Sequence, residues 1–417
     1  MTSTANNTKA TPQAPITTTL LPRYEQSPLL DGQEAICYAT FFSGTPPISF
    51  LRQRVEQIVT LNPVLGGRLK RTLRGICVKV PSDSTTVNMQ DHFLVQDTTV
   101  SNQTSPLGVA LPHFIPYNRA AVKGKSPLFV VAVLINKPMN QFCVVISVSH
   151  LIADGATFYN LLKMLDIKIQ PWALTFNLDA DDHNNLAEDA EKVIPNMNIM
   201  MLGILPHFHH PVRFGASLIT TRVLAFPSFC LHAGQWRWKR YDLSKSWIES
   251  QKAVAMAAKP SPNAFVSTND CLVSWFLKTS NVEFAAMYLN LRDKVPQITS
   301  DHAGNYMRPV TFQRGEFETP WLIREAISGK EYGSSVTKTG GKYRAPPKLT
   351  SKFGVVSNVC GLFHQLELPG ECQFVEHHYT LRNNAIGVGN PYCTVYMSKP
   401  GQVCILTNIT FDQNEFV

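Results

Sequence analysis

The residues with the clearest capacity for chemistry lie at positions 147–155, which read SVSHLIADG. His150 ends an apolar run, residues 141–149, whose side chains alternate between two faces as in a strand. An unperturbed imidazole has a pKa of about 6.5, so near neutral pH it can accept a proton and later return it. The pattern favours a general base at a strand end, with a structural histidine as the alternative.

The residues that follow His150 predict a turn and then a helix. Asp154 suits a turn because its short side chain bonds to backbone, and Gly155 suits one because it can take a positive φ. Beyond the turn the apolar residues adopt helical spacing, at Phe158, Leu161, Leu162 and Leu165. We therefore expect His150 between a strand and a helix.

Two neighbouring segments are expected to position that strand. Residues 127–135 form a continuous apolar run, which predicts a strand buried on both faces and paired with 141–149 through a turn at 136–140. Residues 48–61 read as an amphipathic helix with these apolar members: Phe50, Val55, Ile58, Val59 and Leu61.

At 417 residues the chain is longer than one typical domain, and two are expected. We predict a disordered tail at 1–19, a first half at 20–175, a polar and acidic linker at 176–211 and a second half at 212–417. Residues 329–348, rich in Gly and Lys, are predicted to be a mobile loop.

Composition excludes several classes of function. The net charge of +8 can attract anionic partners, but no dense Lys/Arg tract appears, so nucleic-acid binding is not expected. No run of about 18 apolar residues is present, and the N-terminus lacks a secretory signal. We predict a cytoplasmic protein and leave peripheral contact with a membrane open.

No metal site or disulfide framework is expected. The nine cysteines form no Cys-x-x-Cys pair, which favours a reducing compartment. No carboxylate or cysteine follows the histidines at 207, 209 and 210 at ligand spacing, and the pair His377–His378 is likewise not expected to bind a metal. Motifs for a Gly-x-Ser-x-Gly hydrolase, a phosphate-binding loop and a dinucleotide fold are absent.

Five stretches follow one another along the chain: NPVLGGRL at 62–69, HLIADG at 150–155, RYDLS at 240–244 with STNDCLVSW at 267–275, LNLR at 289–292 with GNY at 304–306, and VSNVCG at 356–361. Together they resemble the chloramphenicol-acetyltransferase-like, or HxxxDG, acyltransferase superfamily. This superfamily includes BAHD enzymes, wax-ester synthases/diacylglycerol acyltransferases and peptide-synthetase condensation domains. The matches span most of residues 25–410.

The resemblance implies an α/β fold of two chloramphenicol-acetyltransferase-like domains, each a mixed β-sheet flanked by helices, with an active-site tunnel at their interface. It implies transfer of an acyl group from acyl-coenzyme A to a hydroxyl, with His150 as general base and no covalent acyl-enzyme. Acyl-coenzyme A is then a co-substrate, and no bound cofactor is expected. The acceptor classes are a fatty alcohol, an acylglycerol or a specialised metabolite.

The same resemblance assigns roles to further residues. Asp154, next to Gly155, is expected to form a structural ion pair with Arg292 instead of acting as a relay. Ser357 and Asn358 are expected near the substrate as oxyanion donors, with backbone amides as an alternative. Asn269 is another candidate, for which a helix N-cap is the competing interpretation.

Two departures leave the branch unassigned. The Asp-Phe-Gly-Trp-Gly motif of BAHD enzymes is absent, and residues 364–370, HQLELPG, stand near its place. Ser149 occupies the position where condensation domains and wax-ester synthases carry a second histidine. The alternatives are a catalytically silent binding or scaffold member of this fold and an amide-forming enzyme with a carrier-bound acyl donor.

Overall fold

The computed structural model describes residues 16–21, 35–73, 75–81, 87–100, 123–124, 126–176, 238–258, 260, 264–328, 352–380 and 391–416. The predicted loop at 329–348, the histidines at 207, 209 and 210, and the linker beyond residue 176 lie outside the described residues. None of the helices in the described ranges is long and apolar enough to span a membrane.

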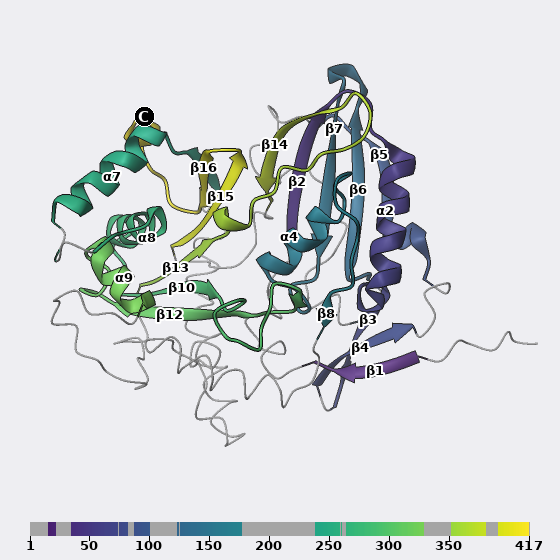
Figure 1. The fold of residues 1–417 in the computed structure, drawn as a ribbon, viewed down its shortest axis with the longest axis horizontal. Coiled ribbons are helices and arrows are strands. Elements are labelled where there is room, and N and C mark those ends of the chain that lie inside the picture. The colour runs from purple at the N-terminus through teal and green to yellow at the C-terminus, as the bar shows by residue number, and fades with distance from the viewer. Residues whose placement is uncertain are drawn as a thin grey trace, which may run out of the picture.

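His150 follows a central strand of a five-stranded sheet whose order is β14-β2-β7-β6-β5 (Figure 1). The strands are β2 (Ile36–Ser43), β5 (Phe93–Asp97), β6 (Phe129–Asn136), β7 (Gln141–Val148) and β14 (Gln373–Tyr379). The predicted pairing of 127–135 with 141–149 is confirmed, since β6 and β7 are antiparallel with Asn136 opposite Gln141. The turn between them ends at Asn140, which has a positive φ of 47°.

Two helices, α2 (Ile48–Leu61) and α4 (Gly155–Lys163), belong to the same half. The four predicted apolar residues at and after α4 are fully buried. The bounds predicted for α2 are correct, and Val55, Ile58 and Val59 are buried as predicted, but the buried face differs at its margins. Leu51 and Arg54 are buried on it, whereas Leu61, the last residue, is 42% exposed. Arg54 is tolerated there because its guanidinium donates to the Ile167 carbonyl.

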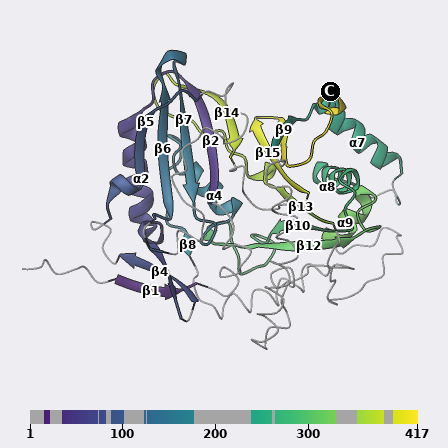
Figure 2. The same cartoon turned by 180° about the vertical axis from the view of Figure 1, so that it is seen from behind.

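The other half contains a six-stranded sheet of order β12-β10-β13-β15-β16-β9. Helices α7 (Lys245–Ala257), α8 (Thr268–Thr279) and α9 (Pro320–Ser328) lie together beside this sheet (Figures 1 and 2). The strands are β9 (Lys239–Asp242), β10 (Phe284–Asn290), β12 (Met307–Gln313), β13 (Phe353–Asn358), β15 (Tyr392–Lys399) and β16 (Gln402–Thr407). Two mixed sheets with flanking helices confirm the predicted fold class.

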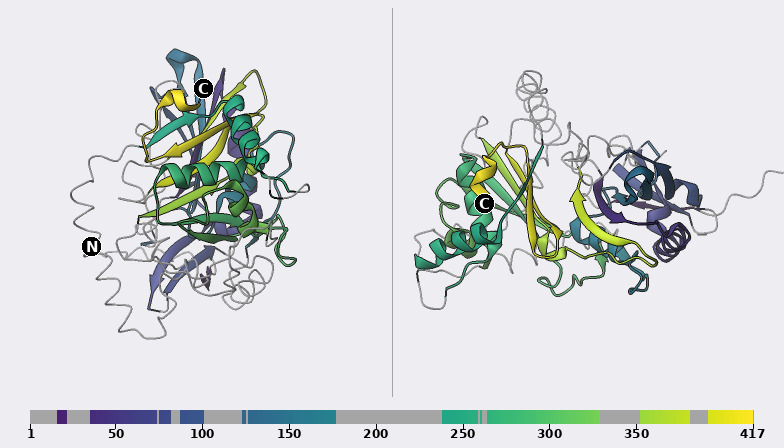
Figure 3. Two further views of the ribbon diagram at one scale, coloured as in Figure 1. Left: turned by 90° about the vertical axis from the view of Figure 1, so that its left-hand side faces the viewer. Right: turned by 90° about the horizontal axis from the view of Figure 1, so that it is seen from above.

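The predicted halves are not separate in sequence. Strand β14 belongs to the stretch 212–417, yet it pairs antiparallel with β2 of the first sheet, and Figure 3 shows the two strands side by side. A second crossing joins β8 (Thr175–Phe176) to β11 (His302–Ala303) in a parallel pair. A boundary drawn along the chain therefore cannot separate the two sheets.

The predicted tail also ends earlier than expected. Strand β1 (Ile16–Leu20) pairs with β4 (Gly75–Pro81), which in turn pairs with β3 (Arg68–Thr72). The physical reason is the sequence ITTTL, because β-branched residues favour an extended backbone.

Charged side chains join the edge strands of the two sheets. Arg240 on β9 donates to Glu376 on β14 over 2.6 Å, and His378 lies 2.8 Å from the same carboxylate. These side chains are at most 13% exposed. Burial alone would raise the pKa of Glu376, but the hydrogen bonds from His378 and Arg240 outweigh it and lower that pKa to about 2.

We predict that Glu376→Gln removes an acid-sensitive part of the stability. A carboxyl group with a pKa lowered from 4.5 to about 2 stabilises the fold above pH 4.5 and loses this effect as the pH falls toward 2. The effect is about 3 kcal/mol. Urea unfolding measures the free energy of unfolding of both proteins. The difference between wild type and variant should become smaller as the pH is lowered from about 7 to 3.

Asp97→Asn is the matched control, because the Lys137–Asp97 pair in the same sheet is about two-thirds exposed. Its loss should cost less than about 1 kcal/mol. If the difference in free energy of unfolding between wild type and Glu376→Gln stayed constant across this pH range, the stabilising role of the Glu376 carboxylate would be wrong.

Candidate active site

The side chain of His150 is oriented by a residue of the other half. Its Nδ1 lies 3.1 Å from Asn305 Oδ1, and Asn305 Nδ2 donates to the His150 carbonyl over 2.8 Å. An amide oxygen only accepts hydrogen bonds, so this contact assigns the ring proton to Nδ1. Nε2 is then left with the lone pair that a general base requires.

The surroundings of His150 keep the imidazole neutral. Burial lowers its pKa from the usual value, and contacts with its own backbone, Asp154, the Ala153 backbone and Asn305 oppose that effect without cancelling it. A neutral imidazole near pH 7 can accept a proton at once.

Asp154 is fully occupied by donors other than His150. Its Oδ1 accepts from the Thr157 backbone N–H over 2.9 Å, which caps α4, and lies 3.1 Å from the Thr157 hydroxyl. Its Oδ2 accepts from Arg292 Nη1 over 2.7 Å and from the Tyr306 N–H over 3.0 Å. Asp154 is thus placed to hold the turn in shape.

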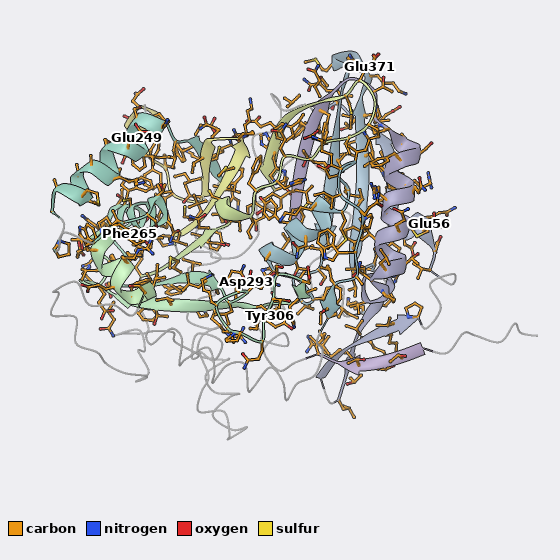
Figure 4. All side chains as sticks on the ribbon, in the orientation of Figure 1. Glu56, Glu249, Phe265, Asp293, Tyr306 and Glu371 are labelled. Carbon is orange, nitrogen blue, oxygen red and sulfur yellow. The ribbon has the colours of Figure 1, made fainter. Side chains whose placement is uncertain are left out.

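Arg292 ties the start of α4 to the segment that contains Asn305. Besides Asp154, it donates to the His302 carbonyl over 2.8 Å and to the Gly304 carbonyl over 3.2 Å. Asp154 and Arg292 are 2% and 4% exposed. Figure 4 labels Tyr306 below α4, near the end of β12. The ion pair and the support of His150 therefore share one segment.

Gly155 allows the start of α4 to pack closely on a neighbouring segment. It is the first residue of α4 and is not among the residues of positive φ, so the expected turn conformation is wrong. A Cβ at this position would lie 3.1 Å from Cγ1 of Val359 and 3.8 Å from Leu362. The start of α4 thus packs on the chain that directly follows Asn358.

The structure brings Asn358 and Asn269 together. Asn358 Nδ2 donates to Asn269 Oδ1 over 2.8 Å, and Asn358 Oδ1 accepts from the Cys360 N–H over 2.9 Å. Ser357 precedes this pair at the end of β13. The candidate residues therefore form two groups, which Val359 connects through its contact with Gly155.

Asn269 is not the N-cap of α8. Ser267 caps the helix, and Asp270 completes a capping box with the Ser267 N–H. Asp270 also accepts a hydrogen bond from Arg324. The side chain of Asn269 is left to contact Asn358 and Met287.

Among the described residues no group of three or more His, Cys, Asp or Glu side chains is placed to hold a metal ion. His377 lies 2.9 Å from the Thr40 hydroxyl and 3.3 Å from the Tyr159 hydroxyl. Burial lowers the pKa of His377 to about 3.

The sequence did not identify the supporting roles of Asn305 and Thr157. Asn305 is visible only as part of the pattern GNY, and nothing local connects it to a histidine 155 positions earlier. Thr157 offered a local signal, because an Asp followed three residues later by a hydroxyl is compatible with a helix cap.

Comparison with solved structures identifies the fold. F. graminearum TRI101, complexed with coenzyme A and deoxynivalenol, aligns with a TM-score of 0.56 and 13% identity over 94% of each chain. Vinorine synthase aligns with a TM-score of 0.56 and 12% identity over 96% of this chain and 91% of the other. The condensation domain of the Monacolin K polyketide synthase MokA aligns with a TM-score of 0.54 and 10% identity over 97% of this chain and 95% of the other.

These structures share the chloramphenicol-acetyltransferase-like fold, so this chain has the fold that its motifs resemble. At identities of 10–13% the likeness concerns the fold. No family model matches the sequence, and no curated protein matches it either.

We predict that Asp154→Asn destabilises the protein by about 3 kcal/mol, because Arg292 would keep its charge in a buried site without its carboxylate. Chemical denaturation measures the loss. A double-mutant cycle with Arg292→Gln should give a coupling energy above about 1 kcal/mol.

His150→Ala is the matched comparison, with a stability loss of only about 1 kcal/mol for its hydrogen bond to Asn305. If Asp154→Asn kept the stability of wild type but lost as much activity as His150→Ala, the structural role of Asp154 would be wrong. Asp154 would then take part in the reaction itself.

Proposed function

We propose that this protein is an acyl-coenzyme A-dependent O-acyltransferase in which His150 is the general base. The observation that carries the proposal is the state of the imidazole. Burial favours its neutral form, and its Nδ1–H is directed at Asn305 of the other half, which leaves the lone pair on Nε2. This is the state that proton removal from an alcohol requires.

The proposed reaction is one direct transfer. His150 Nε2 takes the proton of the acceptor hydroxyl while its oxygen attacks the thioester carbonyl, which gives a tetrahedral oxyanion. The C–S bond then breaks, and the imidazolium returns the proton to the leaving thiolate. The products are an ester and free coenzyme A, and no covalent acyl-enzyme forms because the thioester is already activated.

Oxyanion stabilisation is assigned to the end of β13. An amide group has two N–H donors, and the contact with Asn269 uses one of those of Asn358. The hydrogen bond from the Cys360 N–H fixes the orientation of this amide, which is the preorganisation that such a donor needs. Ser357 and backbone amides of the same segment are the further candidates.

The fold supports the choice of substrates. TRI101, with this fold, is complexed with coenzyme A and deoxynivalenol, and the net charge of +8 here favours an anionic co-substrate. Among the predicted acceptors we therefore favour a specialised-metabolite hydroxyl over a fatty alcohol or an acylglycerol. The cytoplasmic location and peripheral membrane contact stay predictions.

A second candidate is an amide-forming enzyme with a carrier-bound acyl donor. The alignment with the MokA condensation domain favours it, since the same fold occurs there. The base would remain His150, and only the partners would differ.

The test is release of free thiol from acyl-coenzyme A of several chain lengths in the presence of a panel of alcohols and amines. We expect acceptor-dependent release that falls by about 10²–10⁴-fold in His150→Ala. Release no faster than that of the variant for every alcohol would contradict the proposal. Activity confined to amines and carrier-bound donors would support the second candidate.

We also predict the pH dependence. The base must be unprotonated, so kcat/KM should fall as the pH decreases through the pKa of His150. Burial lowers that pKa, so the midpoint should lie below the ordinary histidine value of about 6.5. Initial rates from pH 4.5 to 9 measure it, and a midpoint above 7 would contradict a buried neutral base.

A further inference from the structure

The six-stranded sheet has two faces with different surroundings. Cys393, Val395 and Ile405 pack in the core on the side of the helices. The alternate residues Tyr396, Cys404 and Leu406 belong instead to the core of the first half, together with Tyr38, Phe158 and Tyr159. We call this second side the inner face, because it is directed at the half that contains His150.

Two buried hydroxyl groups lie on the inner face, and one of them has no hydrogen-bond partner in the described part of the chain. Tyr396 is 0% exposed, and its hydroxyl makes no hydrogen bond within the described part of the chain. Thr394 is 3% exposed, and its hydroxyl is a side-chain hydrogen-bond partner of Tyr392. Buried hydroxyls are normally hydrogen-bonded, because leaving one unpaired is unfavourable.

These hydroxyls form one wall with Ser357, one of the candidate oxyanion donors, whereas Asn358 contacts α8 on the other side of the sheet. Thr394 on β15 is the register partner of Ser357 on β13, so the two lie on adjacent strands about 5 Å apart. Tyr396 follows on the same face, about 7 Å further along β15. Beyond Ser357 the chain reaches Val359, which contacts Gly155 beside His150.

The cation near this wall is already paired with carboxylates. Arg240 is paired with both Glu376 and Asp242, and all three contribute to the electrostatic surroundings of Tyr396. An anionic ligand group would therefore compete with two carboxylates for Arg240 and would not recover its loss of hydration. A neutral ligand group that donates or accepts one hydrogen bond is the partner that the hydroxyls of Tyr396 and Thr394 can bind.

We propose that Tyr396, supported by Thr394, recognises a second, uncharged oxygen function of the acceptor, so that the substrate class is a polyoxygenated small molecule. This inference rests on the proposed function and specifies its acceptor. The reacting hydroxyl is placed at His150, and the second hydroxyl or carbonyl bonds to the inner face. An unbranched fatty alcohol has no group for that contact.

The test compares Tyr396→Phe with wild type on acceptors that differ in one hydroxyl, cyclohexanol with the cyclohexanediols and decanol with its terminal diol. We expect wild type to prefer a diol, and the ratio of kcat/KM for that diol over the mono-alcohol to fall about tenfold in the variant. Calorimetric binding of the same diol to His150→Ala, with and without Tyr396→Phe, should weaken similarly.

Tyr241→Phe is the matched control, because Tyr241 lies in the same sheet but packs in the core on the helix side. Its hydroxyl accepts from the Phe411 N–H over 2.8 Å and lies 3.3 Å from the Phe411 carbonyl. This variant should lower Tm without changing the preference among acceptors. Tyr396→Phe removes an unpaired buried hydroxyl, so its Tm should not fall.

The outcomes separate the two proposals. If wild type acylates alcohols but shows no preference for diols, or if Tyr396→Phe leaves the preference unchanged, the role of Tyr396 is wrong and the acyltransferase function stands. If no alcohol supports thiol release above the His150→Ala level, the proposed function fails. A fall in Tm for Tyr396→Phe as large as that for Tyr241→Phe would mean that the hydroxyl has a structural role.

Discussion

The buried ion pair between Asp154 and Arg292 is the interaction on which the rest of the site depends. Two charges at 2% and 4% exposure are tolerated because both side chains make further hydrogen bonds, Asp154 with the Thr157 and Tyr306 amides and Arg292 with the carbonyls of His302 and Gly304. This requirement fixes segment 302–306 against the start of α4, and Asn305 is thereby brought to His150.

The predictable part of the structure is the part encoded by local periodicity. The alternation at 141–149 predicted β7 almost to the residue, and the helical spacing after Gly155 predicted the helix α4, because each pattern reflects burial of one face. The ion pair between Asp154 and Arg292 came from the resemblance. The support of His150 by Asn305 was missed because it depends on a contact between residues 155 positions apart.

The same reasoning explains why the domain boundary was wrong. Strand β14 contains Glu376, His377 and His378 and is polar enough to read as a loop, yet it is an edge strand of the first sheet. Its polar residues are compensated by partners on other elements, by Arg240 on β9, Thr40 on β2 and Tyr159 on α4. No local pattern shows such partners, so the sequence alone could not place this strand.

The crossing of β14 also has a consequence for synthesis. Strand β2 remains an unpaired edge of the first sheet until residue 379 has been made, about 200 residues after Phe176. At about 5–20 residues per second this interval is about 10–40 s. An exposed edge strand that includes Tyr38, Phe41 and Phe42 is a template for pairing with another chain during that time. Protection of the nascent first half is therefore a requirement of this topology.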